Sequence, residues 1–129
     1  MLAGLVLPMH LWLVVGAPAE APIEPIQTTT IEYIMTVAEG YGVSGHEMVV
    51  TLNCESSLRH EGIFGDGGKA YGIAQFHEPT FEMFKQSAIK AGYPFDDFSY
   101  QSDRDQIELM AWAFKNGLQK HWTCWSKNF

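Results

Sequence analysis

The chain has 129 residues, a mass of 14.5 kDa and 47% hydrophobic residues, which is enough apolar material to build the core of one domain. This composition excludes a largely disordered chain. The formal net charge of -7 and the pI near 5.0 exclude a nucleic-acid-binding protein, because the chain has no basic stripe with which to neutralise phosphates.

Residues 1–15 form the only long apolar run, and Pro8 and His10 interrupt it. The run falls short of the ~20 residues of a comfortable membrane span. Residues 17–19, Ala-Pro-Ala, fit the pattern of a signal cleavage site, although no Lys or Arg precedes the run. We expect residues 1–19 to be a cleaved signal peptide, with an uncleaved membrane anchor or a cytoplasmic helix as the alternatives. The protein is then exported, to the periplasm, the cell wall or the medium, and meets a membrane only if this segment is retained.

Residues 20–28 are predicted to be an extended linker, because they hold two prolines and show no helical period. The folded domain is expected to span residues 29–129. Thr29–Glu32 has the spacing of a capping box and predicts a first helix that ends near Gly40.

A second helix is predicted from the capping box Ser44–Glu47. Met48, Leu52 and Glu55 fall on one narrow arc of its surface, so Glu55 lies in the last turn beside the buried face. A carboxylate in that place loses hydration and meets the negative end of the helix dipole. Both effects raise its pKa, which a general acid requires.

The segment from Gly62 to Gly68 is rich in glycine, and Asp66-Gly67 within it is a strong turn signal. Residues 70–76 are short and able to form a strand. We therefore predict a small hairpin or an irregular loop next to the second helix, and no large sheet.

Two further helices complete a mainly α fold. One is predicted to open at Glu78-Pro79, with the proline in its first turn, and to end at Gly92. The other is capped by Ser102 or Asp103 and is apolar almost all round, which predicts the buried central helix of the domain.

Cys54 and Cys124 are the only cysteines, and an exported chain with two cysteines permits one disulfide. Two buried free thiols are the alternative. Neither cysteine belongs to a Cys-x-x-Cys pair, and the histidines show no metal-binding spacing, so no metal site is expected.

Four short motifs occur in order along the chain: Glu55-Ser56, then Tyr71–Gln75, then Pro79-Thr80, then Ala113–Gly117. Together they resemble the catalytic core of the SLT-type lytic transglycosylases, over Ser44 to Gly117. The resemblance implies a lysozyme-like helical domain with a glycine-rich hairpin or loop beside the catalytic helix. It also implies, without any cofactor, cleavage of the MurNAc to GlcNAc bond of peptidoglycan that leaves a 1,6-anhydro end. Glu55 is then the acid for the glycosidic oxygen and afterwards the base for the C6 hydroxyl.

The same resemblance suggests residues that bind the substrate. Ser56 is expected to orient the carboxyl group or the sugar, and a helix-end serine bonded to backbone is the alternative. Gln75 matches a family glutamine whose amide suits the N-acetyl and hydroxyl groups of a sugar. Tyr71 and Phe76 flank it, and we expect only one of the two rings to stack on a sugar, because alternate residues of a strand point to opposite faces.

One departure from the family pattern is Phe114, which stands where the family has a tyrosine. Tyr100 and Tyr71 are the candidates to supply the missing hydroxyl. Asp66 is the candidate second carboxylate, although its residue type also suits a plain Asp-Gly turn. If Asp66 acts with Glu55, the chain is a lysozyme-type muramidase, because hydrolases usually need two carboxyl groups. A catalytically silent glycan-binding protein is the third hypothesis. Under each of them we expect a monomer whose partner is the peptidoglycan glycan strand.

Overall fold

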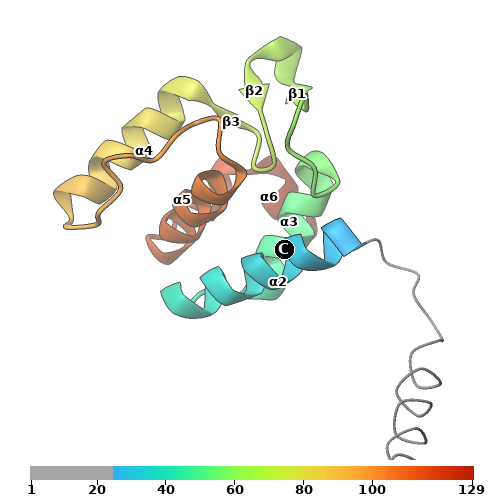
Figure 1. Ribbon diagram of the computed structural model, residues 1–129, viewed down its shortest axis with the longest axis horizontal. Helices are drawn as coiled ribbons and strands as arrows, with labels where there is room; N and C mark the ends of the chain where they lie inside the picture. Colours follow the sequence, from blue (N-terminus) through green and yellow to red (C-terminus); the bar gives the residue numbers. More distant parts are fainter. Residues whose placement is uncertain (1–24) are drawn as a thin grey trace, which may run out of the picture.

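The computed structural model describes residues 25–129, and Figure 1 shows how their elements are arranged. The predicted signal peptide or anchor at residues 1–19 lies outside the described residues, as does the linker as far as residue 24. Within residues 25–129, no helix is both long enough and apolar enough to cross a bilayer.

The described residues form a mainly helical domain, as the sequence predicts, and a small three-stranded antiparallel sheet stands where the sequence predicted a hairpin or an irregular loop. Figure 1 places the sheet above the C-terminal end of α3, with α2 on the opposite side of the molecule. In chain order the elements are α2 (Pro25–Tyr41), α3 (Gly45–Ser56), β1 (Phe64–Gly65), the 3-10 turn η1 (Asp66–Gly68), β2 (Ala70–Tyr71), β3 (Phe76–His77), α4 (Glu78–Lys90), α5 (Asp103–Lys115), the 3-10 turn η2 (Gln119–His121) and α6 (Thr123–Asn128).

The starts of three helices follow from local sequence signals. Ser44 caps α3 and Ser102 caps α5, each through a side-chain oxygen that accepts a backbone N–H from the first turn of its helix. Pro79 lies in the first turn of α4, where a missing N–H costs nothing. These starts agree with the predicted ones.

The start of α2 corrects the linker prediction. The helix begins at Pro25, four residues before the predicted capping box, so residues 25–28 are helical. Proline fixes a φ close to the helical value, and the N–H that it lacks has no partner in a first turn. The two prolines that suggested an extended linker are therefore compatible with a helix that starts at the second of them.

The core of the domain is built around α5, which packs against both α2 and α4. Nearly all of its residues from Gln106 to Phe114 are buried, which confirms the predicted central helix. The largest fully buried apolar side chains outside α5 are Trp122, Phe76, Phe81, Phe95, Ile34, Met48, Leu52 and Ile73.

A disulfide joins Cys54 in α3 to Cys124 in α6, across 70 positions of sequence. The predicted pairing is confirmed. A bond of this kind is typical of an oxidising, exported environment. It also fixes α6, which has only six residues, against the last turn of α3.

The sheet consists of two-residue strands in the register Phe64↔Tyr71↔Phe76 on one line and Gly65↔Ala70↔His77 on the next. Residues paired across antiparallel strands lie on the same face. The aromatic trio therefore shares one face, and His77 lies on the other. Between β1 and β2 the chain turns through Asp66 and Gly67, both at positive φ, as the Asp-Gly signal predicts.

Candidate functional site

Glu55 lies in the last turn of α3 and is half-buried. Burial raises the pKa of its carboxyl group, which is the direction expected from the sequence. The backbone N–H of Cys124 and the charge of Lys127 oppose this, because both favour the carboxylate form. The carboxyl group thus keeps its proton to a higher pH than an exposed glutamate does, although one backbone N–H and one positive charge favour its charged form.

The contact between Glu55 and α6 depends on the disulfide beside it. Cys54 precedes Glu55 in the chain, and its partner Cys124 supplies the backbone N–H that faces the carboxyl group. The bond between the two sulfur atoms therefore holds that donor in place. The sequence pointed to the cysteine pair but not to this consequence, and Lys127 was not predicted at all.

Ser56 is buried, and its hydroxyl donates to the carbonyl oxygen of Ile73 at 2.8 Å, with that of Leu52 at 3.1 Å. The bond ties the end of α3 to the segment between β2 and β3, which we call the β2–β3 loop (residues 72–75). Of the two expectations for Ser56, the backbone-bonded one describes this geometry.

Gln75, which belongs to the β2–β3 loop, also bonds to backbone through its side chain. Its side-chain nitrogen donates to the carbonyl oxygens of Ile63 and Gly72, at 3.1 and 2.9 Å. Both amide hydrogens of Gln75 are thereby used inside the protein. A Cβ atom at Gly65 would lie 2.2 Å from the side-chain oxygen of Gln75, so a larger residue there would displace the Gln75 amide group.

Two buried polar side chains that the sequence did not single out hold the same loop. The Ile73 N–H donates to Nδ1 of His60 at 3.0 Å, so His60 carries its proton on Nε2, which lies 2.7 Å from the Gln101 carbonyl oxygen. Gln106 accepts the N–H of Ala74 at 3.0 Å. The sequence feature that could have pointed to Gln106 is its place as a polar residue within the most apolar helix.

The remaining donors of Gln106 reach the carbonyl oxygens of Tyr71 and Tyr100, at 3.1 and 3.0 Å. The indole N–H of Trp122 donates to the Ala74 carbonyl at 2.9 Å. Because the loop makes so few sheet contacts, these side chains supply the partners that its buried backbone needs. The β2–β3 loop is consequently held between the end of α3 and the residue that precedes α6.

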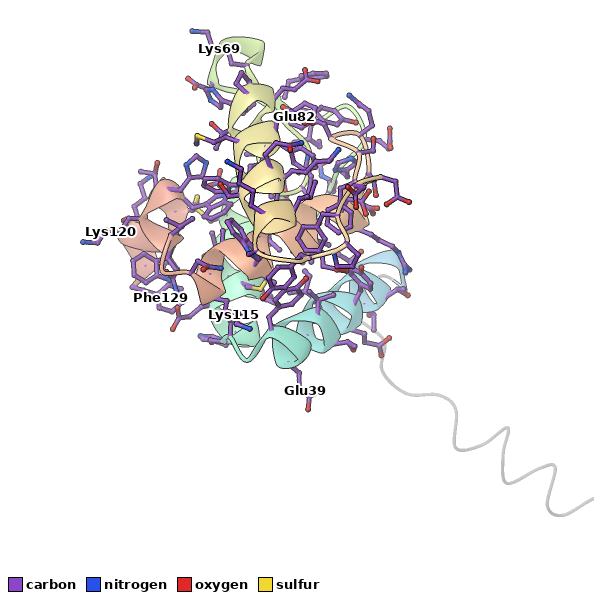
Figure 2. The ribbon with its side chains drawn as sticks, turned by 90° about the vertical axis from the view of Figure 1, so that its left-hand side faces the viewer. Glu39, Lys69, Glu82, Lys115, Lys120 and Phe129 are labelled. Atoms are coloured by element: carbon purple, nitrogen blue, oxygen red, sulfur yellow. A yellow bond between two sulfur atoms is a disulfide. The ribbon has the colours of Figure 1, made fainter. Side chains whose placement is uncertain are left out.

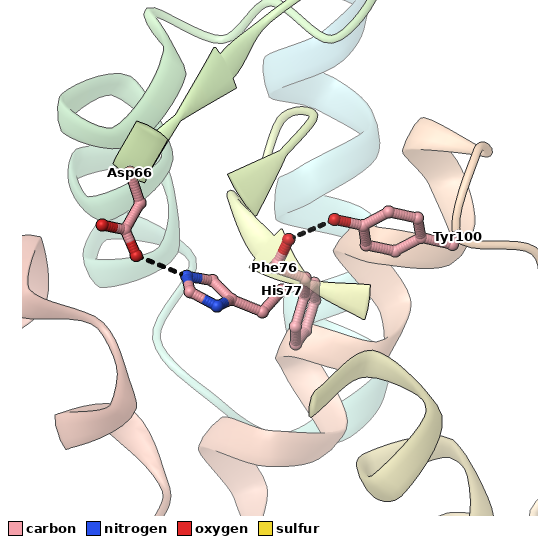
Figure 3. A network of polar contacts seen from close by, with 4 residues as sticks. All are labelled: Asp66, Phe76, His77 and Tyr100. Carbon is pink, nitrogen blue, oxygen red and sulfur yellow. Dashed lines mark hydrogen bonds and ion pairs between the residues drawn. The ribbon is translucent and has the colours of Figure 1, made fainter. Parts of the chain in front are cut away.

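The predicted aromatic residues have different surroundings. Phe76 is 0% exposed and packs against Phe81 and Trp122, so its ring belongs to the core and offers no face to a ligand. Tyr71 is 8% exposed and borders a cavity together with Tyr100. The Tyr100 hydroxyl donates to the backbone carbonyl of Phe76 (Figure 3). The structure thus leaves Tyr71 as the one ring of the expected pair that reaches a cavity.

Phe114 is 3% exposed and packs against the Trp122 ring, with 5.7 Å between the ring centroids. A buried aromatic ring in this place needs no hydroxyl group, and a tyrosine hydroxyl there would need a partner of its own. The departure from the family pattern at this position is therefore compatible with a well-packed core.

Asp66 lies in η1, and its carboxylate contacts Nε2 of His77 at 2.7 Å (Figure 3). The Asp66 side chain is largely open to solvent, and that of His77 is partly buried. His77 lies near His121, whose pKa is lowered mainly by burial and further by the charge of His77. The sequence predicted Asp66 as a possible partner of Glu55, and the partner that the structure gives it is a histidine.

Among the described residues, no group of three or more His, Cys, Asp or Glu side chains is arranged to hold a metal ion. Comparison of the chain with protein family models, with curated proteins and with solved structures found no match.

Proposed function

We propose that this chain is an exported peptidoglycan lytic transglycosylase that cleaves the MurNAc to GlcNAc bond with Glu55 as its only catalytic carboxyl group. The observation that carries the proposal is the half-buried Glu55 carboxyl, whose pKa is raised by burial and whose charged form is met by the Cys124 N–H and Lys127. The catalytic group must first give a proton and then exist as an anion. The raised pKa favours the first state, and the Cys124 N–H and Lys127 favour the second.

The reaction then has two steps. The protonated Glu55 gives its proton to the glycosidic oxygen, and the bond from this oxygen to C1 of MurNAc breaks. The C6 hydroxyl oxygen of the same sugar bonds to C1, and its proton goes to the Glu55 carboxylate. No water is consumed, and Glu55 ends the cycle protonated, as it began. The Cys124 N–H and Lys127 stabilise the carboxylate between the two steps.

A single carboxyl group favours this reaction over hydrolysis, for which a second one is usually needed. Asp66 is the candidate for that second group, and its side chain is paired with His77. A muramidase that uses Glu55 and Asp66 is the alternative that the experiment must separate, together with a glycan-binding protein without activity.

The test is digestion of purified peptidoglycan, with the released products analysed by mass spectrometry. We expect 1,6-anhydro ends, and a loss of at least about a thousandfold in rate for Glu55→Gln, because a lost acid and base removes the main chemical contribution. The matched control is Glu61→Gln, an exposed glutamate in the segment that follows α3. It should keep full activity.

Three outcomes overturn the proposal in different ways. If the products carry ordinary reducing ends, and Asp66→Asn abolishes their formation, the chain is a muramidase. Full activity of Glu55→Gln removes Glu55 as the acid. Binding of muramyl oligosaccharides without any product identifies a protein that binds glycan but does not cleave it.

A further inference from the structure

A cavity of about 250 Å³ lies between the β1–β2 hairpin, the N-terminal end of α4 and the loop before α5. It is smaller than the ~300–1,000 Å³ of cavities that take drug-sized ligands. Its size suits one residue-sized group. None of the residues that line it belongs to the contacts described above for Glu55.

Aromatic rings form one wall of this cavity. The Tyr71 ring lies 5.0 Å from that of Phe64 and 5.8 Å from that of Tyr100, measured between centroids. Phe64 is 65% exposed on a two-residue strand, so most of its ring surface is open to a bound group and is not packed in the core. Faces of aromatic rings attract cations as well as apolar groups.

Two opposite charges complete the lining. Glu78 comes from the first turn of α4 and Lys69 from the end of the hairpin turn, where Figure 2 shows it at the tip of the molecule. Glu78 lies close enough to Tyr100 for its charge to raise the pKa of that phenol, after the larger effect of burial. Within residues 25–129, neither Lys69 nor Glu78 forms an ion pair, with the other or with a third residue.

We propose that this cavity binds the zwitterionic end of an amino acid in the peptide stem of peptidoglycan. The ammonium group is held by Glu78 and the aromatic wall, and the carboxylate by Lys69. That the ligand comes from peptidoglycan rests on the proposed function. That the ligand is a zwitterion follows from the charged residues that line the cavity. A neutral sugar would leave both charges unused. A sugar with a free ammonium would use Glu78 alone and be repelled by Lys69.

Binding is measured by calorimetry on the full chain carrying Glu55→Gln, so that no ligand is cleaved. The probes are a muramyl disaccharide with a tripeptide that ends in meso-diaminopimelate, the same disaccharide without peptide, the free tripeptide and a chitosan oligosaccharide. We expect the tripeptide to improve the affinity of the disaccharide by about tenfold or more, because two charge-assisted contacts are added.

Glu78→Gln and Lys69→Met should each remove most of this gain and leave binding of the bare disaccharide unchanged. Phe64→Ala should reduce the gain in part. The matched controls are Glu82→Gln, one turn along α4 (Figure 2), and Lys90→Met at the end of the same helix. Both are exposed and lie outside the cavity lining, so both should bind like the parent chain.

The proposal is overturned if Glu78→Gln and Lys69→Met keep the gain. It is also overturned if the affinity for chitosan equals that for the peptide ligands and Lys69→Met does not weaken the binding of chitosan. The site would then recognise an ammonium group alone. Failure of the glycosidase proposal has a different signature. The chain then yields no cleavage product, but it still binds the free tripeptide, and Glu78→Gln still abolishes that binding.

Discussion

At the scale of single residues, Glu55 is governed by two opposing influences. Burial favours its neutral form, and the Cys124 N–H and Lys127 favour its anion. A donor acid must be protonated before the reaction, so the rate constant kcat/KM is expected to fall as the pH rises through the pKa of Glu55. The position of that fall reports the balance between the two influences.

Replacing Lys127 tests this balance directly. Lys127→Gln removes a positive charge that lowers the pKa of Glu55, so the fall in kcat/KM should move to higher pH. Added salt should reduce the difference between variant and parent, because Lys127 is exposed and its charge is screened. The measurement is a pH profile of peptidoglycan cleavage at two salt concentrations.

Lys120→Gln is the control for that profile, since it removes an exposed charge of the same sign from η2, which is not among the groups that act on Glu55. Its profile should match the parent. A Lys127→Gln profile that is unchanged, or that moves to lower pH, contradicts the assigned role.

At the scale of elements, the β2–β3 loop is ordered by side chains and not by its own sheet. Two-residue strands are too short to be stable alone. Ser56, His60, Gln106 and Trp122 each bond to the backbone at or next to this loop. A Cβ atom at Gly72 would lie 2.5 Å from the His60 ring and 2.7 Å from Nε2 of Gln106, so the backbone approaches both side chains as closely as glycine allows.

Gln106→Leu should show how much this network contributes. The change leaves the Ala74 N–H and the carbonyl oxygens of Tyr71 and Tyr100 without their partner. Each orphaned buried group costs about 1–3 kcal/mol, so a loss of roughly 3 kcal/mol or more in the free energy of unfolding is expected. Denaturant unfolding measures it. Gln86→Leu, on the exposed side of α4, should change stability by less than about 0.5 kcal/mol.

An equal, small loss in both variants would mean that solvent reaches the loop and replaces the missing partners. The network would then not be what orders the loop.

The disulfide is expected to stabilise the fold and the site together. Closing a loop of 70 positions is rated at about 4 kcal/mol by the chain-entropy model. The six residues of α6 are too few for a helix that is stable alone, so reduction should also release the Cys124 N–H from Glu55. We expect the double variant Cys54→Ser with Cys124→Ser to lose stability in denaturant unfolding.

Activity of the double variant, measured at a temperature where it is still folded, should fall as well. The parent chain under reducing conditions provides the control, because it should lose both properties to the same extent. Full activity in the folded double variant contradicts the link between the bond and Glu55.

The elements that the sequence could predict are those with local signals. Ser44, Ser102 and Pro79 mark helix starts through contacts within one turn, and the Asp-Gly pair marks the hairpin turn. The contacts that hold the loop join residues 13 to 48 positions apart, and no short motif encodes them. For the same reason Ser56 and Gln75 could be recognised as a pattern while their backbone partners could not.

At the scale of the whole molecule, three partly desolvated groups make stability depend on pH. Burial raises the pKa of Glu55 and Glu108 above their usual 4.5 and lowers that of His121 below its usual 6.5. Glu108 lies on α5 and accepts a hydrogen bond from Tyr41 on α2 at 3.3 Å, which opposes the rise. The His121 ring packs against Phe84 and Trp122. The three groups come from separate parts of the fold.

The two kinds of shift act in opposite directions. Between 4.5 and the raised pKa values, the folded protein keeps carboxyl protons that the unfolded chain has released, so the free energy of unfolding falls as the pH rises. Between 6.5 and the lowered pKa of His121, the unfolded chain holds a proton that the folded protein lacks, so the free energy of unfolding falls as the pH drops. The net slope between 4.5 and 6.5 is the sum of the two.

Two substitutions should separate these slopes, because each removes one titrating group and keeps its shape. Glu108→Gln retains an acceptor for Tyr41 and should lessen the fall in the free energy of unfolding with rising pH. His121→Phe retains a ring against Phe84 and should lessen the fall with dropping pH. The measurement is denaturant unfolding at a series of pH values, with Glu39→Gln, an exposed glutamate at the end of α2 (Figure 2), as a control that follows the parent curve. If either variant reproduces the parent curve, its group does not carry the pH dependence, and the desolvation assigned to it is wrong.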